Sequence, residues 1–131
     1  MLNRVIQEYD IADTACIHKP TKEIGNEYAR SSMLVMSSNY EGFPMVMIEA
    51  MACGLPVVSY DFKCGPKDII DNGRNGLLVR EGDIDGLANA MMELMGDETL
   101  RQRMSVNAKK VVDTYSEENV MKQWLDLFAS L

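Results

Sequence analysis

Two glutamates separated by seven residues, Glu41 and Glu49, are the residues whose types and spacing best suit chemistry in this sequence. Between them a Gly-Phe-Pro turn at residues 42–44 leads directly into a segment of helical composition. A loop that enters a helix presents backbone N–H groups and the positive end of the helix dipole, and phosphate is a common anion at such a place. The pattern therefore predicts an anion-binding loop flanked by two carboxylates.

Glu49 stands among apolar residues, at positions 46–48 before it and 50–53 after it. Burying a carboxylate in such a frame costs roughly several kcal/mol unless hydrogen bonds compensate it. We therefore expect a poorly hydrated carboxylate that accepts hydrogen bonds from a ligand, and sugar hydroxyls are suitable donors. The alternative stays open that Glu41 is an ordinary loop acid and that Glu49 is bonded by backbone or a lysine.

Short apolar segments alternate with longer helical ones around this motif, which predicts parallel strands joined by helical crossovers. We expect strands at residues 14–17, 33–36, 55–59 and 76–79, and helices at 2–9, 22–31, 45–53 and 66–71. Pro44 suits the first position of the helix at 45–53, and Gly54 suits its end. The predicted fold class is α/β, a Rossmann-like doubly wound parallel sheet in one domain over residues 1–131.

Three helices close the chain, at residues 83–96, 97–115 and about 116–131, with Asp83, Asp97 and Ser116 suited to cap them. The last helix places its apolar residues on one face. The chain begins on a helix, whereas a doubly wound sheet normally begins on its central strand. We therefore expect a partial domain, with a segment missing in front of Met1.

The composition excludes several classes of protein. The 131 residues suffice for one domain, and the hydrophobic share of 47% is ordinary for a globular protein. The net charge of −7 argues against nucleic-acid binding, which needs a basic face. Three scattered cysteines and one histidine give no disulfide framework or zinc site. The first residues do not resemble a signal peptide, so we expect a cytoplasmic protein.

Residues 41–57 resemble the signature of family 4 retaining glycosyltransferases of the GT-B fold, also called glycosyl transferases group 1. That signature reads E-G-F-P/G-x-x-x-x-E-A-M-A-x-G-x-P-V, and both glutamates are in place. Residues 65–70 and 75–79 resemble the family's G-P-x-E-I-I and N-G-L-L-V blocks, with Asp68 where the family usually has glutamate. The three blocks stand in the family's order, which makes the resemblance specific.

The resemblance implies the C-terminal, donor-binding domain of a GT-B enzyme that transfers a sugar from a nucleotide diphosphate sugar, in polysaccharide or glycoconjugate synthesis. Glu41, as the catalytic residue, would contact the transferred sugar, and Glu49 the ribose. Residues 18–22 would hold the nucleobase, largely through backbone groups. The final helix would run back toward the N-terminal domain, so Trp124 is a candidate for exposure in this sequence. The implied donor-binding set is Gly42, Phe43, Pro44, Met45, Val46, Glu49, Lys19, Gly65 and Pro66.

The family generally needs no metal or other cofactor. Its acceptor-binding N-terminal domain, and the arginine and lysine that grip the diphosphate, are missing from this sequence. We therefore expect the fragment alone to bind donor weakly and to be inactive; peripheral association of the full-length enzyme with a membrane stays open. Two alternatives remain: a non-catalytic nucleotide-sugar-binding or regulatory module, and another GT-B-like enzyme such as an epimerase or a phosphorylase.

Overall fold

The computed structural model describes residues 1–131 and contains one parallel sheet of three strands. The strands are β1 (Leu34–Met36), β2 (Val57–Asp61) and β3 (Gly76–Arg80), in the order β1-β2-β3. In the register Val35 lies opposite Val58, and Val58 lies opposite Leu77. Because the strands are parallel, their carboxyl ends meet at one edge of the sheet, and this confirms the predicted α/β class.

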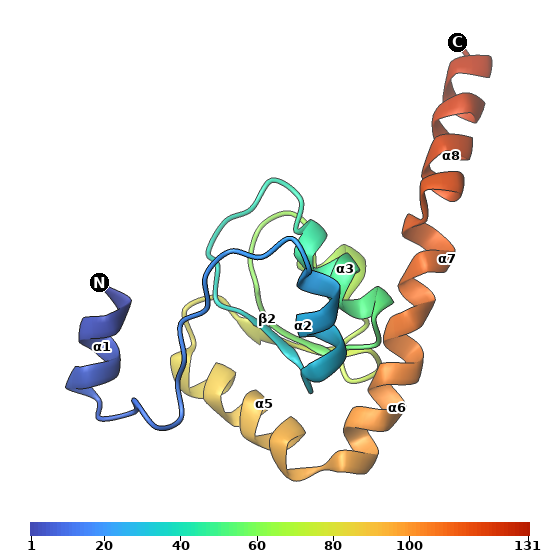
Figure 1. The fold of residues 1–131 in the computed structure, drawn as a ribbon. Helices are drawn as coiled ribbons and strands as arrows, with labels where there is room; N and C mark the ends of the chain where they lie inside the picture. The colour runs from blue at the N-terminus through green and yellow to red at the C-terminus, as the bar shows by residue number, and fades with distance from the viewer.

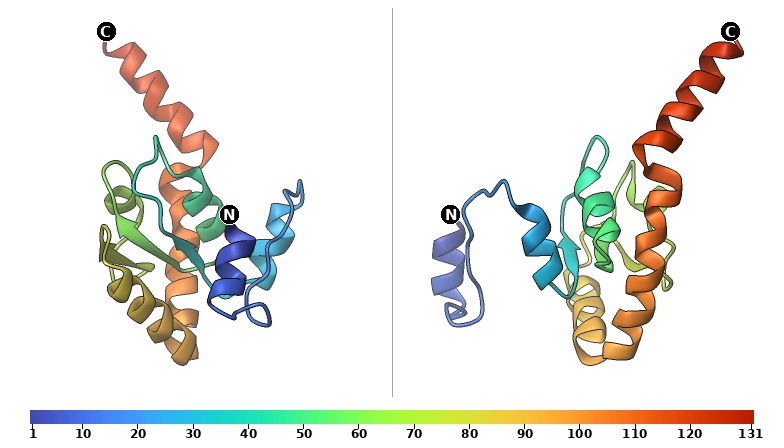
Figure 2. Two further views of the ribbon diagram at one scale, coloured as in Figure 1. Left: turned by 90° about the vertical axis from the view of Figure 1, so that its left-hand side faces the viewer. Right: turned by 45° about the vertical axis from the view of Figure 1, so that its right-hand side comes forward.

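The helices surround this sheet as Figure 1 shows. Helix α3 packs against β2, α2, α6 and α7, whereas α5 packs against β2 and β3. Helix α1 has no buried residue and stands apart from the sheet in Figure 1 and in the right-hand view of Figure 2. The bounds are α1 Leu2–Glu8, α2 Ile24–Arg30, α3 Met45–Ala52, α4 Pro66–Ile69, α5 Ile84–Gly96, α6 Glu98–Ala108, the 3-10 helix η1 Lys109–Val111, α7 Val112–Tyr115 and α8 Glu117–Ala129.

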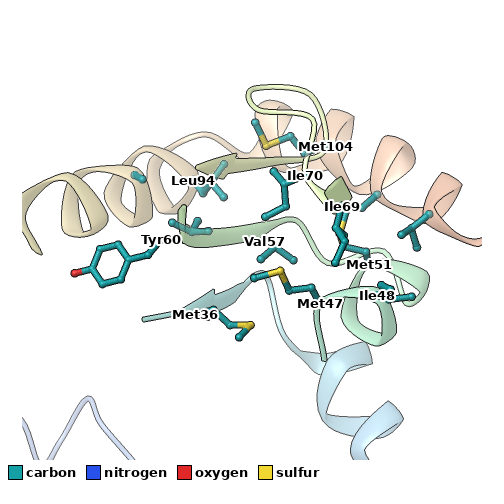
Figure 3. Close-up of a cluster of buried hydrophobic side chains, with 14 of the residues drawn as sticks. Met36, Met47, Ile48, Met51, Val57, Tyr60, Ile69, Ile70, Leu94 and Met104 are labelled. Carbon is teal, nitrogen blue, oxygen red and sulfur yellow. The ribbon is translucent and has the colours of Figure 1, made fainter. Parts of the chain in front are cut away.

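The core joins the sheet to its helices through side chains with no exposed surface. Met47 and Met51 of α3 lie beside Val57 of β2, and Leu94 of α5 and Met104 of α6 complete the same cluster (Figure 3). Helix α3 is thus held along most of its length by apolar contact. Removing a fully buried side chain of this size costs about 2–5 kcal/mol. The core therefore gives the residues at the start of α3 a rigid support.

The expected strand at residues 14–17 is wrong. Residues 11–15 form a turn after α1, in which the N–H groups of Thr14 and Ala15 both donate to the carbonyl of Ile11, at 3.0 and 2.8 Å. No strand lies beside residues 14–17, so their amides have no ladder to join. A four-residue apolar run does not by itself distinguish a strand from a turn. The sheet accordingly has three strands rather than four.

Three predicted helix starts and one predicted helix end are confirmed by their capping residues. The Asp83 and Asp97 side chains accept from the N–H groups of Gly86 and Leu100, at 2.9 and 2.8 Å, and Ser116 caps α8. Gly54 follows the end of α3 with a φ of +89°. Two details differ. Pro44 is the N-cap of α3 rather than its first helical residue, and the helix expected at 97–115 divides into α6, η1 and α7.

Helix α8 projects from the rest of the molecule toward the C-terminus, as Figures 1 and 2 both show. None of its residues is buried. Trp124 is 51% exposed, which confirms the sequence prediction, and its ring stacks on that of Phe128 with 5.7 Å between centroids. No helix of the chain combines the length and the apolar character needed to cross a membrane.

Candidate active site

Two loops follow neighbouring strands at the carboxyl edge of the sheet. The first loop, residues 37–44, leads from β1 into α3, and the second loop, residues 62–65, leads from β2 into α4. In the first loop the Ser38 hydroxyl donates to Glu41 Oε1 at 2.8 Å. Glu41 is half-buried, and this hydrogen bond holds one oxygen of its carboxylate. The other oxygen, Oε2, makes no hydrogen bond within the chain.

The backbone at the start of α3 has three N–H groups, those of Gly42, Phe43 and Val46, without a backbone acceptor in the chain. The Met45 amide is already used, since it donates to the Phe43 carbonyl at 2.9 Å, and Pro44 has no N–H. These three groups lie at the positive end of the α3 dipole, where an anion is stabilised. The arrangement suits a phosphate. Of the backbone N–H groups predicted to bind the donor within residues 42–46, these three have no acceptor in the chain.

Glu49 lies one turn further along α3 and is exposed, so the expectation of a buried carboxylate is wrong. Consecutive helical residues point in different directions, and α3 turns Met47, Ile48, Ala50 and Met51 inward while Glu49 faces outward. The Tyr28 hydroxyl, from α2, donates to Glu49 Oε2 at 3.4 Å. The carboxylate is therefore anchored on one oxygen and has Oε1 available for a ligand.

Tyr28 is itself buried, with 6% of its surface exposed. Burial raises the pKa of its phenol above 10.0, and the charge of Glu49 and the hydrogen bond to it act in the same direction. The phenol is thus protonated at neutral pH and remains a donor to Glu49. The sequence analysis assigned Tyr28 no role, because the two residues are 21 positions apart and on different helices.

The second loop packs directly on the first. Gly65 has a φ of +116°, and a Cβ built on it would lie 2.4 Å from Pro44 Cδ. No other residue type fits there without moving one of the loops. The structure therefore brings Gly65, and with it Pro66, beside Pro44 at the start of α3.

The end of α7 also contacts these loops. Tyr115, the last residue of α7, packs its ring against that of Phe43, with 5.9 Å between centroids and a tilt of 52°. Its hydroxyl donates to the carbonyl of Asp68 in α4 at 2.8 Å. Burial, with the charge of Asp68, raises the pKa of the Tyr115 phenol. Sequence analysis missed this residue, since 71 residues separate it from Phe43 and no motif links the two.

Lys19 makes no side-chain hydrogen bond or ion pair with the residues of the two loops. It lines a shallow hollow with His18, Pro20 and Ile24 beside α2, and neither Glu41, Glu49 nor residues 42–46 line that hollow. Among the nearby basic residues, Lys67 Nζ pairs with Asp61 Oδ2 at 2.8 Å. No three His, Cys, Asp or Glu side chains are grouped so that they could hold a metal ion. The assembled site thus consists of two carboxylates, three amides and two loops.

Comparisons with known proteins indicate the family of this chain. The family model described as Glycosyl transferases group 1 matches residues 1–111. An exopolysaccharide phosphotransferase of Streptomyces coelicolor is 37% identical over 131 residues, which is 99% of this chain and 14% of the relative. A poly(ribitol-phosphate) alpha-N-acetylglucosaminyltransferase of Staphylococcus aureus is 35% identical over 99 residues, 75% of this chain and 20% of the relative.

Among solved structures, a mutant of S. aureus TarM in complex with Fondaparinux, alpha-GlcNAc-glycerol and UDP aligns with a TM-score of 0.91 and 28% identity. The alignment covers 97% of this chain and 26% of TarM. The expected GT-B type of fold is thereby confirmed. The chain spans only a minor part of the length of each of these relatives.

Proposed function

This chain belongs to the glycosyl transferases group 1 family, and we propose that it forms the donor-binding part of a retaining glycosyltransferase. The whole enzyme transfers a sugar from a nucleotide diphosphate sugar to an acceptor in polysaccharide or glycoconjugate synthesis. One observation carries the proposal: the packing of Gly65 on Pro44 brings two loops together around an α3 start that is flanked by two anchored glutamates.

The start of α3 receives the diphosphate. When the bond between the sugar and the β-phosphate breaks, negative charge grows on the departing phosphate oxygens. The N–H groups of Gly42, Phe43 and Val46 are already oriented at the end of the helix dipole and need no reorganisation to meet this charge. In the TarM structure, a relative of this chain is in complex with UDP, a nucleoside diphosphate.

Each glutamate contributes one anchored and one available oxygen. Glu41, fixed through Oε1 by Ser38, presents Oε2 to the hydroxyls of the transferred sugar. Glu49, whose Oε2 accepts a weak hydrogen bond from Tyr28, presents Oε1 to the ribose hydroxyls. A charge-assisted hydrogen bond of this kind contributes about 1.5–3 kcal/mol. Two such bonds orient the donor without any group acting as a general base.

The test uses the full-length protein with a panel of UDP-, GDP- and ADP-sugars and an acceptor oligosaccharide, and it measures nucleoside diphosphate release. Glu41→Gln should lower kcat/KM by about 100-fold or more, since the lost contact acts on the reacting sugar. Glu93→Gln on α5, which is exposed and makes no side-chain hydrogen bond or ion pair, is the matched control. Proton NMR of the product gives its anomeric configuration, and inversion would refute the retaining mechanism.

The same assay addresses the remaining alternatives. Donor binding without transfer to any acceptor would favour a non-catalytic module. Turnover of the sugar nucleotide without an acceptor would favour an epimerase. Full activity in excess EDTA would support the expectation that no metal is required.

A second candidate is transfer of a sugar phosphate rather than a sugar. The relative from Streptomyces coelicolor, which matches 99% of this chain, is named a phosphotransferase. The two reactions break different bonds: sugar transfer releases a nucleoside diphosphate, and sugar-phosphate transfer releases a nucleoside monophosphate. A donor labelled with ³²P at its β-phosphate decides between them. Label in the released nucleotide supports sugar transfer, and label in the product supports phosphate transfer.

A further inference from the structure

We propose that Tyr115 is a positioning residue of the donor site, which fixes the spacing between the first loop and the second loop. The proposal rests on the proposed function, in that it takes the start of α3 as the diphosphate site. It adds a residue that lies outside all three sequence blocks of the resemblance. Tyr115 touches no reacting atom in this arrangement, and it acts through the residues that it holds.

A closed series of contacts joins Tyr115 to the first loop, the second loop and α4. Its aromatic ring packs on Phe43 of the first loop, and its hydroxyl donates to the Asp68 carbonyl in α4 at 2.8 Å. Helix α4 begins at Pro66, directly after Gly65, and Gly65 packs back on Pro44 beside Phe43. The first loop is therefore held at two neighbouring residues, on one side by the second loop and on the other by Tyr115.

This closed series of contacts affects the backbone N–H groups that would bind phosphate. Two of the three, Gly42 and Phe43, belong to the first loop and have no backbone acceptor in the chain to fix them. Phe43 is 46% exposed, and its ring packs on that of Tyr115. A catalytic group displaced by a fraction of an ångström loses much of its effect. Loosening Tyr115 should thus weaken donor binding without altering either glutamate.

Two substitutions separate the contacts of Tyr115. Tyr115→Phe removes only the hydroxyl bond to Asp68, whereas Tyr115→Leu also removes the ring that packs on Phe43. Tyr9→Phe is the matched control, because Tyr9 is 70% exposed and its hydroxyl makes no hydrogen bond. The measurements are donor KM and kcat for the full-length protein, together with amide hydrogen exchange in residues 41–46.

We expect Tyr115→Phe to raise the donor KM about threefold to tenfold, the equivalent of one lost hydrogen bond, with a smaller change in kcat. Tyr115→Leu should raise it further. The double variant Tyr115→Leu/Phe43→Leu should raise the donor KM by less than the product of the two single fold-changes, because both substitutions remove the same contact. A purely structural role would lower kcat through loss of folded enzyme and leave KM unchanged.

The inference is overturned if both Tyr115 variants keep a donor KM within about twofold of the wild type, which is the range of the control. If Tyr115→Leu does not fold, Tyr115→Phe decides the question alone. If the wild-type protein uses no sugar nucleotide, the proposed function fails. Hydrogen exchange still tests the role of Tyr115 in that case: faster exchange in residues 41–46 of Tyr115→Phe than of Tyr9→Phe supports it, and equal exchange refutes it.

Discussion

Gly65 lies where the two loops meet, and its replacement by alanine tests that contact. The residue has a φ of +116° and a ψ of −52°, a backbone conformation that L side chains rarely adopt. An added Cβ would lie 2.4 Å from Pro44 Cδ and 2.8 Å from Pro44 Cγ. The proline ring is rigid, so the overlap can be relieved only by moving the first loop or the second loop.

The cost of Gly65→Ala has two parts that other glycines separate. Backbone strain costs about 1–3 kcal/mol, the overlap about 1–3 kcal/mol more, and the stiffer unfolded chain returns about 0.4–1 kcal/mol. A net loss of about 1–5.6 kcal/mol, centred near 3 kcal/mol, follows from these terms. Gly73, with a φ of +80° and nothing within 4 Å of its Cβ position, bears the strain alone. Gly25 lies inside α2 with open space around it, so Gly25→Ala should stabilise the domain by about 0.5–1 kcal/mol.

The assay is urea unfolding of the full-length protein, followed by hydrogen exchange in peptides from residues 34–80, so that the signal belongs to this domain. The expected order of stability is Gly25→Ala, wild type, Gly73→Ala and then Gly65→Ala. Gly65→Ala should also raise the donor KM, whereas Gly73→Ala should not. Equal stability of Gly65→Ala and Gly73→Ala would show that Pro44 and Gly65 are not in contact, and the two-loop site would lose its main support.

Three further outcomes are expected. Glu49→Gln should raise the donor KM about tenfold for a ribonucleotide and far less for a dideoxyribonucleotide, while Tyr28→Phe should raise it about twofold because its 3.4 Å bond is weak. The folded-state pKa values of Tyr28 and Tyr115 are raised above 10.0, so their contribution to stability is complete below pH 10 and is lost as the pH rises through those values. In urea titrations at alkaline pH, the free energy of unfolding should therefore fall less steeply with pH in the double variant Tyr28→Phe/Tyr115→Phe than in the wild type. Asp83→Ala should destabilise the domain by about 1 kcal/mol in the same titration at pH 7, through loss of the α5 cap on Gly86.

Features with local causes could be predicted from the sequence. The cap residues Asp83 and Asp97 and the terminating Gly54 depend on groups within a few positions, and the structure confirms each. The first loop and α3 follow from one contiguous motif. The contact of Gly65 with Pro44 of that loop is non-local, and neither the residues nor the resemblance indicated it.

The errors concern surroundings rather than residue types. The apolar run at residues 14–17 has strand composition, but no strand lies beside it. Glu49 is flanked by buried residues in the sequence and still faces outward, because α3 rotates each residue by about 100° from the last. Tyr115 reaches Phe43 only through the path of α6, η1 and α7. Each of these depends on tertiary placement that a single sequence does not encode in a short window.

The charge of the site bears on how the donor is held. A nucleotide sugar bound with micromolar affinity requires about 8 kcal/mol. An exposed helix start contributes about 0.3–1 kcal/mol toward an anion, and the chain carries a net charge of −7. Lys67, which follows the second loop, is already paired with Asp61. The amides and glutamates can therefore orient the diphosphate and sugar, but they leave much of its charge uncompensated. We accordingly expect basic side chains from outside residues 1–131 to share this site, so that donor affinity in the whole enzyme depends on ionic strength more steeply than the contacts of this chain would predict.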